Sequence, residues 1–171
     1  MTTDVAVAIR PFEAADGPQV QPLLEQAFGG TDEADLIDRL MRDGELVLTL
    51  VAECDNEIVG YVAFPRLAIA DESGGPTPAV GLAPLAVAAE ARKRGIGGAL
   101  VRAGLARLRD MGETLVFVLG DPAYYRRFGF DAADPAFRSP YSGPHFMQIR
   151  LCGGGPVSGT IRYPAAFAAL G

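Results

Sequence analysis

The chain has 171 residues and carries 15 Lys and Arg against 21 Asp and Glu, which gives a formal net charge of -6 and a sequence pI of about 4.7. This balance disfavours nucleic acid as a partner, because phosphate backbones are bound by clustered Lys and Arg on a basic domain. Apolar residues make up 49% of the sequence, and a domain of about 150 residues buries roughly 68 to 70% of its unfolded surface. We therefore expect a single domain over residues 1–171 with one core, and a cationic or neutral substrate.

Membrane and secretory classes are also disfavoured. The longest stretch without a charge, residues 73–89, is interrupted by Gly and Pro and cannot supply the ~20 apolar helical residues that span a bilayer. The first ten residues lack a basic segment followed by a long apolar run, so they do not predict a secretory signal. Cys54 and Cys152 have no metal-ligand spacing and indicate reduced thiols. We expect a cytoplasmic protein that does not associate with membranes.

The first quarter of the chain predicts a strand followed by two helices. Residues 5–10 alternate enough to form a short strand, which a proline ends. Asp16 offers an N-cap for a helix whose apolar residues recur at helical spacing until Gly29-Gly30. Thr31 caps a second helix with one apolar stripe, which runs to Gly44.

The pattern then becomes β-rich. Residues 46–53 and 58–70 are separated by the turn 55–57 and predict an antiparallel hairpin. Residues 71–78, rich in Gly and Pro, predict a surface loop.

A further strand is expected over residues 80–87, and its apolar composition is typical of a strand buried on both faces. Pro84 lies within it. Because proline cannot donate a hydrogen bond to a sheet ladder, Pro84 predicts a bulge or a local loss of pairing.

The remainder continues the alternation of helices and strands. Asp121 offers an N-cap for a helical turn. The predicted elements are a helix over 95–111, a strand over 114–119, a helical turn over 122–128, and strands over 145–152 and 160–163. One α+β or mixed α/β domain accounts for this order.

A glycine-rich turn opens the helix that follows the Pro84 strand, with the sequence Arg92-Lys93-Arg94-Gly95-Ile96-Gly97-Gly98. Glycines let backbone NH groups converge, and a helix N-terminus adds partial positive charge, so a phosphate or pyrophosphate is the natural ligand. Three adjacent cations in an acidic protein favour the same ligand.

The residues alone leave several interpretations of this turn open. A Walker motif is excluded, because no Gly is followed by Lys and then Ser or Thr. A dinucleotide-binding fingerprint would need a glycine where Leu100 stands, although Asp121 follows the next strand at a tolerable distance. A simple Gly-rich connector with a solvated, basic helix start is the third interpretation.

Two motifs resemble signatures of the GNAT N-acetyltransferases. The first is Gln or Arg, two residues, Gly, one residue, then Gly or Ala, and it reads here Arg92-Lys93-Arg94-Gly95-Ile96-Gly97. The second is a Tyr four residues before Gly-Phe, and it reads Tyr125-Arg126-Arg127-Phe128-Gly129-Phe130. The longer strings 82–87 and 119–130 are similar to the YhbS-like branch of predicted bacterial acetyltransferases. The resemblance covers roughly residues 5–165.

The resemblance implies the GNAT-like acyl-CoA N-acyltransferase fold, which is α/β (α+β) with a central, mostly antiparallel mixed sheet, splayed at a β-bulge and flanked by helices. It implies that the pantetheine arm of acetyl-CoA lies in the opening and pairs with strand backbone at Leu85, Ala86 and Val87. Residues 92–98 would hold the pyrophosphate, and Asp121 and Tyr124 would lie against the cofactor. Because these contacts are made by backbone amides, side-chain identity at Ile96 is expected to matter little.

The resemblance also implies the chemistry, which is attack of an uncharged amine on the thioester carbonyl. A backbone NH near Val87 would stabilise the oxyanion, and Tyr125 would donate a proton to the departing thiolate. Tyr124 is the alternative donor. The expected strand carboxylate is absent, so ordered water or a carboxylate such as Glu33 or Glu53 would have to act as the base. His145, the only histidine, is expected to be structural.

The sequence therefore predicts an N-acetyltransferase that uses acetyl-CoA as co-substrate, needs no metal, modifies a primary amine of a small molecule or peptide, and is a monomer or homodimer. Two alternatives remain: a non-catalytic acyl-CoA-binding sensor or regulatory module, and a dinucleotide-binding enzyme. Retention of Tyr125 favours the enzyme, and the missing strand carboxylate favours the module.

Overall fold

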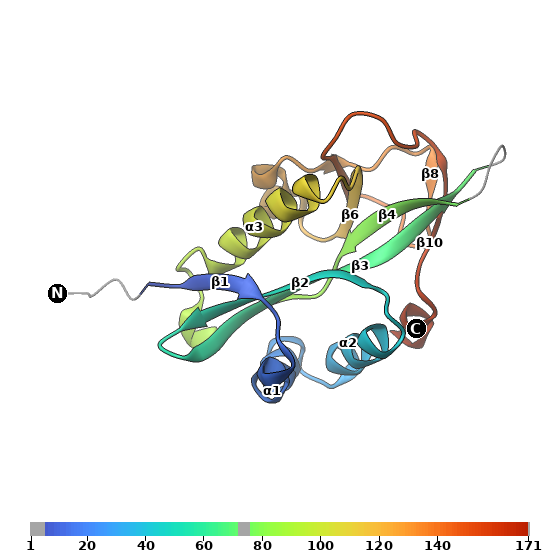
Figure 1. Cartoon of the computed structure of the whole chain (residues 1–171). Helices are drawn as coiled ribbons and strands as arrows, with labels where there is room; N and C mark the ends of the chain where they lie inside the picture. Colours follow the sequence, from blue (N-terminus) through green and yellow to red (C-terminus); the bar gives the residue numbers. More distant parts are fainter. Residues whose placement is uncertain (1–5, 72–75, 171) are drawn as a thin grey trace.

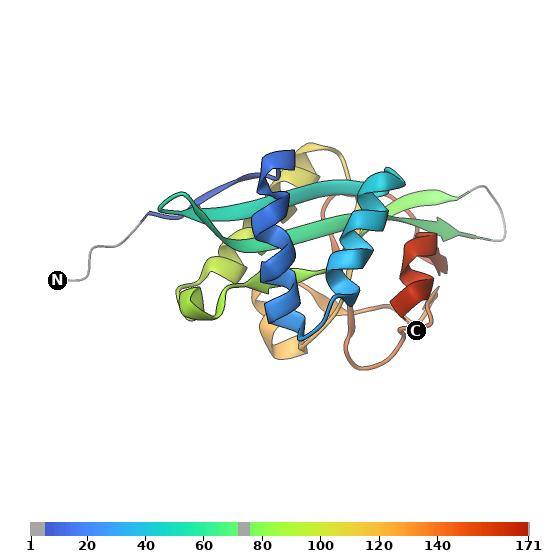
Figure 2. The ribbon, with the colours of Figure 1, turned by 90° about the horizontal axis from the view of Figure 1, so that it is seen from below.

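The fold is built on one mixed sheet with helices on both faces (Figure 1). The structure is a computed structural model and describes residues 6–71 and 76–170. Helices α1 and α2 cross one face of the sheet and α3 lies on the other, as the view from below makes clear (Figure 2). In the part of the chain that the structure describes, no helix is both long and apolar enough to cross a membrane.

The strands follow the order β1-β2-β3-β4-β6-β9-β7 along the main path of the sheet. Their bounds are β1 Ala8–Pro11, β2 Leu46–Cys54, β3 Glu57–Ala70, β4 Thr77–Leu82, β5 Leu85–Val87, β6 Leu115–Leu119, β7 Asp131–Ala132, β8 Phe137–Arg138, β9 Phe146–Arg150 and β10 Gly159–Arg162. The pairs β4–β6 and β8–β10 are parallel, and the other pairs are antiparallel. This is the mixed, mostly antiparallel sheet that was expected.

The helical segments are η1 Ala14–Asp16, α1 Gly17–Phe28, α2 Asp32–Arg42, η2 Ala89–Ala91, α3 Ile96–Asp110, α4 Pro122–Tyr125, η3 Arg126–Phe128 and η4 Ala165–Leu170. The predicted helices therefore exist, and the turn over 122–128 divides into α4 and η3. The short strands β7 and β8 and the C-terminal η4 were not predicted, because two-residue strands and a single 3-10 segment leave no periodic pattern.

Near the N-terminus the predicted helix starts are confirmed, because Asp16 and Thr31 are the N-cap residues of α1 and α2, but the end of the first strand and the capping bonds differ from the prediction. Pro11 belongs to β1 and pairs with Leu50, which an edge strand tolerates; residue 5 lies outside the described residues. Neither Asp16 nor Thr31 makes a side-chain capping bond to its helix. The Asp16 carboxylate instead accepts hydrogen bonds from the Arg10 guanidinium and closes a tight turn before α1.

The loop predicted over 71–78 is shorter in the structure, because Thr77 and Pro78 already pair with β3 as part of β4. Residues 72–75 of that loop lie outside the described residues. The single strand predicted over 80–87 is divided into β4 and β5, and the division falls at Pro84.

The division is a β-bulge, as Pro84 predicted. The Ala83 NH donates to the Ala63 carbonyl at 3.0 Å, and the Ala63 NH donates to the Pro84 carbonyl at 3.1 Å. Two residues therefore face one residue of β3, and the register of pairing shifts by one between β4 and β5. Such a bulge bends the strand and changes the direction of the residues after it.

The bulge opens the sheet. Before it, β4 runs parallel to β6 as far as Leu82, opposite Val118. After it, β5 stays with β3, whereas β6 continues only with β9, where Leu119 pairs with Phe146. Within residues 6–71 and 76–170, β5 has a partner on one side alone, so its other edge faces the end of β6.

Helix α3 is held close to the sheet at two glycines. A Cβ at Gly104 would overlap the ring of Phe64, and a Cβ at Gly60 would lie 2.9 Å from Leu100 Cδ1. Close packing of this kind leaves little room for adjustment. It holds the N-terminal turn of α3 beside β5, where the glycine-rich segment ends.

Candidate functional site

The free edge of β5 presents the peptide groups of Leu85 and Val87. The Ala88 NH donates to the Val59 carbonyl at 2.8 Å, and the carbonyl of Pro84 is also bonded to β3. Because an antiparallel ladder alternates, Ala86 directs its peptide groups to β3, and Leu85 and Val87 direct theirs away. The Val87 carbonyl accepts instead from Arg92 Nε at 3.4 Å.

Ala86 therefore differs from the expectation that its backbone is open to a ligand. It pairs directly with Tyr61, and its side chain is buried. Because peptide groups alternate in direction along the strand, those of Ala86 point to β3, and those of its two neighbours point to the free edge.

The glycine-rich turn has left-handed backbone at two positions. Lys93 has φ 67° and Gly95 has φ 75°, a region that favours glycine. Gly95 is the N-cap residue of α3, so the amides of the following residues point out of the helix N-terminus. This places unpartnered NH groups beside the free edge of β5.

The expectation that the identity of the Ile96 side chain matters little was wrong. Its side chain is 4% exposed, and its Cγ2 lies 3.1 Å from a Cβ built at Gly60. Ile96 therefore anchors the first turn of α3 in the core. Its backbone can face a ligand, but its side chain cannot be exchanged freely.

Three elements meet at Gly97. A Cβ at this position would lie 2.8 Å from Tyr124 Oη, 3.6 Å from Val87 Cγ2 and 3.9 Å from Leu85 Cδ2. Strand β5, the start of α3 and helix α4 thus approach one point, although they are far apart in the sequence. The approach requires the absence of a side chain at Gly97.

A cavity of about 290 Å³ lies at this junction. Its lining consists of Val87, Ala91, Arg92, Lys93, Gly95, Ile96, Gly97, Gly98, Arg102, Tyr124 and Arg127. Most of the predicted cofactor residues are therefore brought together, and none of the lining residues is a carboxylate.

Four predicted cofactor residues do not line the cavity, namely Leu85, Ala86, Arg94 and Asp121. Arg94 is exposed beside it. Asp121 caps α4, where its Oδ1 accepts from the Ala123 NH at 3.0 Å. The cavity also includes three residues that were not predicted to contact the cofactor: Ala91, Arg102 and Arg127. Arg102 stands one helical turn after Gly98, and Arg127 stands within the Tyr125 motif, so both had a local sequence signal.

Tyr125 is buried in a cluster of aromatic rings. Its ring is 5.0 Å from that of Tyr124 and 5.7 Å from that of Phe130, both nearly perpendicular, and a Cβ at Gly120 would overlap it. Burial, with a smaller effect of Tyr124, raises the pKa of Tyr125 to about 12. The phenol is therefore protonated at neutral pH.

The Tyr125 hydroxyl nevertheless reaches the surface. Among the described residues, the one fully buried side-chain oxygen without a hydrogen-bond partner is Tyr61 Oη. No described side chain or backbone group bonds Tyr125 Oη, so this atom keeps some accessible surface. Tyr124, half-buried beside it, has a raised pKa because of desolvation, which the charges of Arg127 and Arg102 oppose.

The candidate bases lie apart from the cavity. Glu53 Oε2 accepts from Arg10 Nη2 at 2.7 Å, so its carboxylate is already paired. Glu33 is partly exposed in the first turn of α2. His145 is exposed, and its carbonyl accepts from the Gly120 NH.

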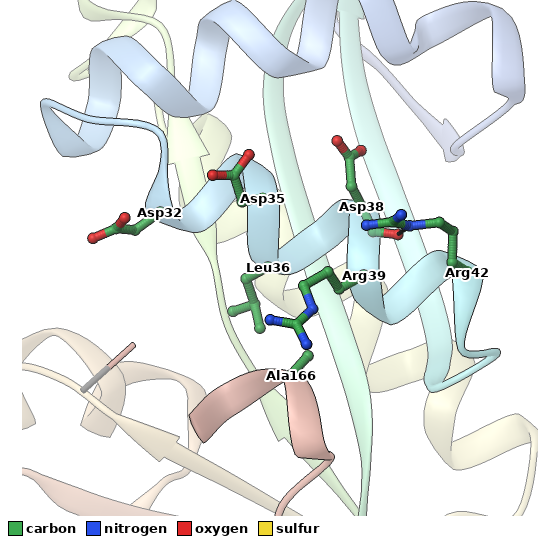
Figure 3. A pocket seen from close by; sticks show the side chains of 7 residues that line it. All are labelled: Asp32, Asp35, Leu36, Asp38, Arg39, Arg42 and Ala166. Carbon is green, nitrogen blue, oxygen red and sulfur yellow. Dashed lines mark hydrogen bonds between the residues drawn. The ribbon is translucent and has the colours of Figure 1, made fainter. Parts of the chain in front are cut away.

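An acidic row on α2 borders a second pocket, of about 310 Å³, on the other face of the sheet. Figure 3 shows Asp35 and Asp38 directed away from Ala166 and Arg39 directed towards it. The Arg42 Nε donates to the Asp38 carbonyl at 3.4 Å. The lining of this pocket includes both acidic and basic side chains, and it shares no residue with the lining of the cavity at the glycine turn.

Sequence comparison relates the chain to acetyltransferases. The family model described as an acetyltransferase (GNAT) domain matches residues 8–133. The uncharacterized N-acetyltransferase YhbS of Escherichia coli K12 is 39% identical over 158 residues, which cover 89% of this chain and 93% of YhbS. The uncharacterized N-acetyltransferase YjhQ of the same organism is 38% identical over 136 residues, which cover 77% of this chain and 75% of YjhQ.

Solved structures agree in fold. The crystal structure of Escherichia coli YhbS in complex with CoA superimposes with a TM-score of 0.89 at 35% identity, and covers 100% of this chain and 97% of that one. A GNAT family acetyltransferase from Brucella melitensis in complex with acetyl-CoA has a TM-score of 0.80 at 33% identity, over 95% and 98% of the two chains. The similarity therefore extends over nearly the whole length of each chain.

Proposed function

The chain belongs to the GNAT acetyltransferase family, and we propose that it is an acetyl-CoA-dependent N-acetyltransferase. In this proposal one domain over residues 1–171 transfers the acetyl group to a primary amine of a small molecule or peptide, by direct attack of the amine on the thioester. CoA and acetyl-CoA, the ligands in the YhbS and Brucella structures, would occupy the opening beside β5.

The convergence at Gly97 carries the proposal. The unpaired edge of β5 offers the peptide groups of Leu85 and the NH of Val87 to an amide-rich chain such as pantetheine, and the first turn of α3 offers NH groups to a pyrophosphate. The edge of β5 and the first turn of α3 are in close contact, since Val87 Cγ2 is 3.6 Å from the Cβ position of Gly97. A ligand with a phosphate at one end and amides along its length fits this arrangement.

The proposed chemistry uses few groups. The Val87 NH, on the free edge, would stabilise the oxyanion that forms as the amine attacks the carbonyl carbon. As the C–S bond breaks, the Tyr125 phenol would donate its proton to the departing thiolate. The attacking nitrogen would lose one proton to solvent, and the Tyr125 phenolate would take one proton back from solvent. With a pKa of about 12, Tyr125 is protonated before each transfer.

Thiol release from acetyl-CoA tests the proposal. We expect release that depends on an added amine, in a panel of polyamines, amino acids, aminoglycosides and peptides. Tyr125→Phe should bind CoA but lose most turnover, whereas Tyr124→Phe, in the same ring cluster, should keep its turnover at saturating acetyl-CoA. A fully active Tyr125→Phe with an inactive Tyr124→Phe would transfer the donor role to Tyr124.

A non-catalytic acyl-CoA-binding module is the second candidate. One observation favours it: the described cavity lining contains no carboxylate that could act as a base. CoA binding without amine-dependent thiol release across the panel would support this candidate. NAD(P) binding without CoA binding would instead refute both and favour a dinucleotide-binding enzyme.

The proposal includes a cytoplasmic location and a monomer or homodimer in a bacterial cell. Acetyl-CoA is supplied in the cytoplasm, and Cys54 and Cys152 are both free thiols. Fractionation of the native host and sedimentation of the purified protein would test the two statements.

A further inference from the structure

We propose that Arg102 and Arg127, together with the Tyr124 hydroxyl, form a second anion site beside the glycine turn. This site binds the 3′-phosphate of coenzyme A and lets the protein distinguish CoA from dephospho-CoA. The inference rests on the proposed function, because it assigns a subsite of the same ligand.

The two arginines reach the same cavity from different elements. Arg102 lies on α3, and its Nη1 is 3.1 Å from a Cβ built at Gly98. Arg127 lies on η3. Both line the cavity beside Gly97 and Gly98.

Aromatic rings hold each guanidinium in place. Arg102 Cζ lies 4.9 Å from the centre of the Phe128 ring, and Arg127 Cζ lies 4.9 Å from the centre of the Tyr124 ring. A guanidinium stacked on a ring keeps its in-plane NH groups available, and these match the oxygens of a phosphate. The rings therefore pre-orient both side chains.

Neither guanidinium is neutralised. Within residues 6–71 and 76–170, the ion pairs shorter than 4.0 Å involve Arg10 and Arg66, not Arg102 or Arg127. The protein carries 21 acidic residues, yet none of those that the structure describes lines this cavity. Two uncompensated positive charges facing one cavity favour an anion there.

The Tyr124 hydroxyl completes the site. Its oxygen lies 2.8 Å from the Cβ position of Gly97, on the cavity side of the ring. The charges of Arg127 and Arg102 both act on this hydroxyl and oppose the desolvation that raises the pKa of Tyr124. All three groups therefore belong to residues that line one cavity of about 290 Å³.

The charge of the ligand groups decides which phosphate binds here. Each phosphate of the pyrophosphate carries about one negative charge and suits the amides at the start of α3. The 3′-phosphate is a monoester with about -1.5 to -2 charges and three free oxygens, which two guanidinium groups match best. Of the other cations near the turn, Arg92 bonds the Val87 carbonyl, and Arg94 lies outside the lining of the cavity. Lys93 is therefore the other residue that could bind the 3′-phosphate.

Calorimetric titration of the full chain with CoA and with dephospho-CoA tests the proposal. We expect the wild type to bind CoA at least about tenfold more tightly, the effect of one charge-assisted hydrogen bond. Arg102→Gln and Arg127→Gln should each lose about tenfold in affinity for CoA and less than about threefold for dephospho-CoA. Arg107→Gln, on an exposed part of α3 outside the cavity, is the matched control and should bind both ligands as the wild type does.

Four results would overturn the proposal. Equal losses for CoA and dephospho-CoA would mean that the arginines hold the pyrophosphate. Loss of discrimination in Lys93→Gln, with discrimination kept in both arginine variants, would assign the 3′-phosphate to Lys93. Equal affinities of the wild type for the two ligands would refute the subsite while leaving the proposed function intact, whereas failure to bind either ligand would refute both. Thermal melting of each variant shows that it is folded.

Discussion

Replacing Gly97 by alanine should weaken ligand binding much more than it changes the stability of the protein. Within a helix, Gly→Ala stabilises by roughly 0.5 to 1 kcal/mol, and Gly97 does not have a positive φ. The new Cβ would lie 2.8 Å from Tyr124 Oη and 3.6 Å from Val87 Cγ2, so the Tyr124 hydroxyl must move by a few tenths of an ångström. The helix gain and this shift should nearly cancel, and we expect the stability of the unliganded protein to change by less than about 1 kcal/mol.

Ligand binding should suffer much more. The methyl group would enter the space in which a pyrophosphate approaches the amides of Gly97 and Gly98. Loss of one hydrogen bond to a charged group corresponds to about 1.5 to 3 kcal/mol, which is roughly a tenfold to hundredfold weaker affinity for CoA. Chemical denaturation without ligand and calorimetric titration with CoA measure the two effects separately.

Gly17→Ala is the matched control, since Gly17 begins α1 and nothing lies within 4 Å of its Cβ position. It should change neither binding nor, by more than a few tenths of a kcal/mol, stability. Unchanged CoA affinity in Gly97→Ala would refute the assignment of the glycine turn as the phosphate site. Destabilisation by several kcal/mol would instead show that the ring cluster around Tyr124 cannot adjust.

The remaining predictions concern the proton donor, the salt-bridge cluster and the packing of α3. Tyr125→Phe should lower kcat by about 100-fold to 10,000-fold with CoA affinity unchanged in titrations; full activity would remove the assignment. Hydrogen bonds from Arg10 lower the pKa of Asp16. The ionised Asp16 carboxylate therefore stabilises the folded protein above the usual aspartate pKa of 3.8, and this stabilisation is lost as the pH falls through the lowered pKa. Asp16→Asn should therefore destabilise by about 1 kcal/mol at neutral pH and flatten the acid limb of the denaturation profile, and an unchanged acid limb would contradict this. Gly104→Ala should destabilise by about 1 to 3 kcal/mol because its Cβ would overlap Phe64; a melting temperature at the wild-type value would show that α3 can move away from β3.

Local signals in the sequence were sufficient for much of the fold. The hairpin of β2 and β3 follows from two β-rich runs around a turn in which Asp55 and Asn56 have positive φ. Pro84 indicated the bulge because a residue without an NH group cannot complete a ladder wherever the strand lies. Both features depend on a few adjacent residues.

The N-terminus of α1 illustrates where local reasoning failed. Asp16 has the residue type and the position of an N-cap, but its carboxylate bonds Arg10, which also bonds Glu53 on β2. The competing partners belong to a cluster that spans 43 residues between Arg10 and Glu53. The hydrogen bonds of the Asp16 carboxylate to a charged guanidinium are stronger than a capping bond to a backbone NH of the helix.

The candidate site divides in the same way. The glycines, the three cations before them and the two tyrosines were recognisable because each motif lies within a few residues of sequence. Arg102 and Arg127 were missed as a pair, since no spacing relates a residue of α3 to one of η3 until both reach the same cavity. Ala86 was included with its two neighbours because the sequence does not reveal which strand edge is free, and its backbone pairs with β3.

The amino-acid sequence alone was enough to place the main helices and the longer strands, the bulge and the glycine-rich start of α3, because backbone conformation at Gly and Pro depends on local geometry. The edge of β5 that is left unpaired, the side chains that meet at Gly97 and the members of the 15 cations that face one cavity became known from the folded structure. Those outcomes depend on strand pairing and helix packing between residues distant in the chain, and no local pattern encodes the distances that result.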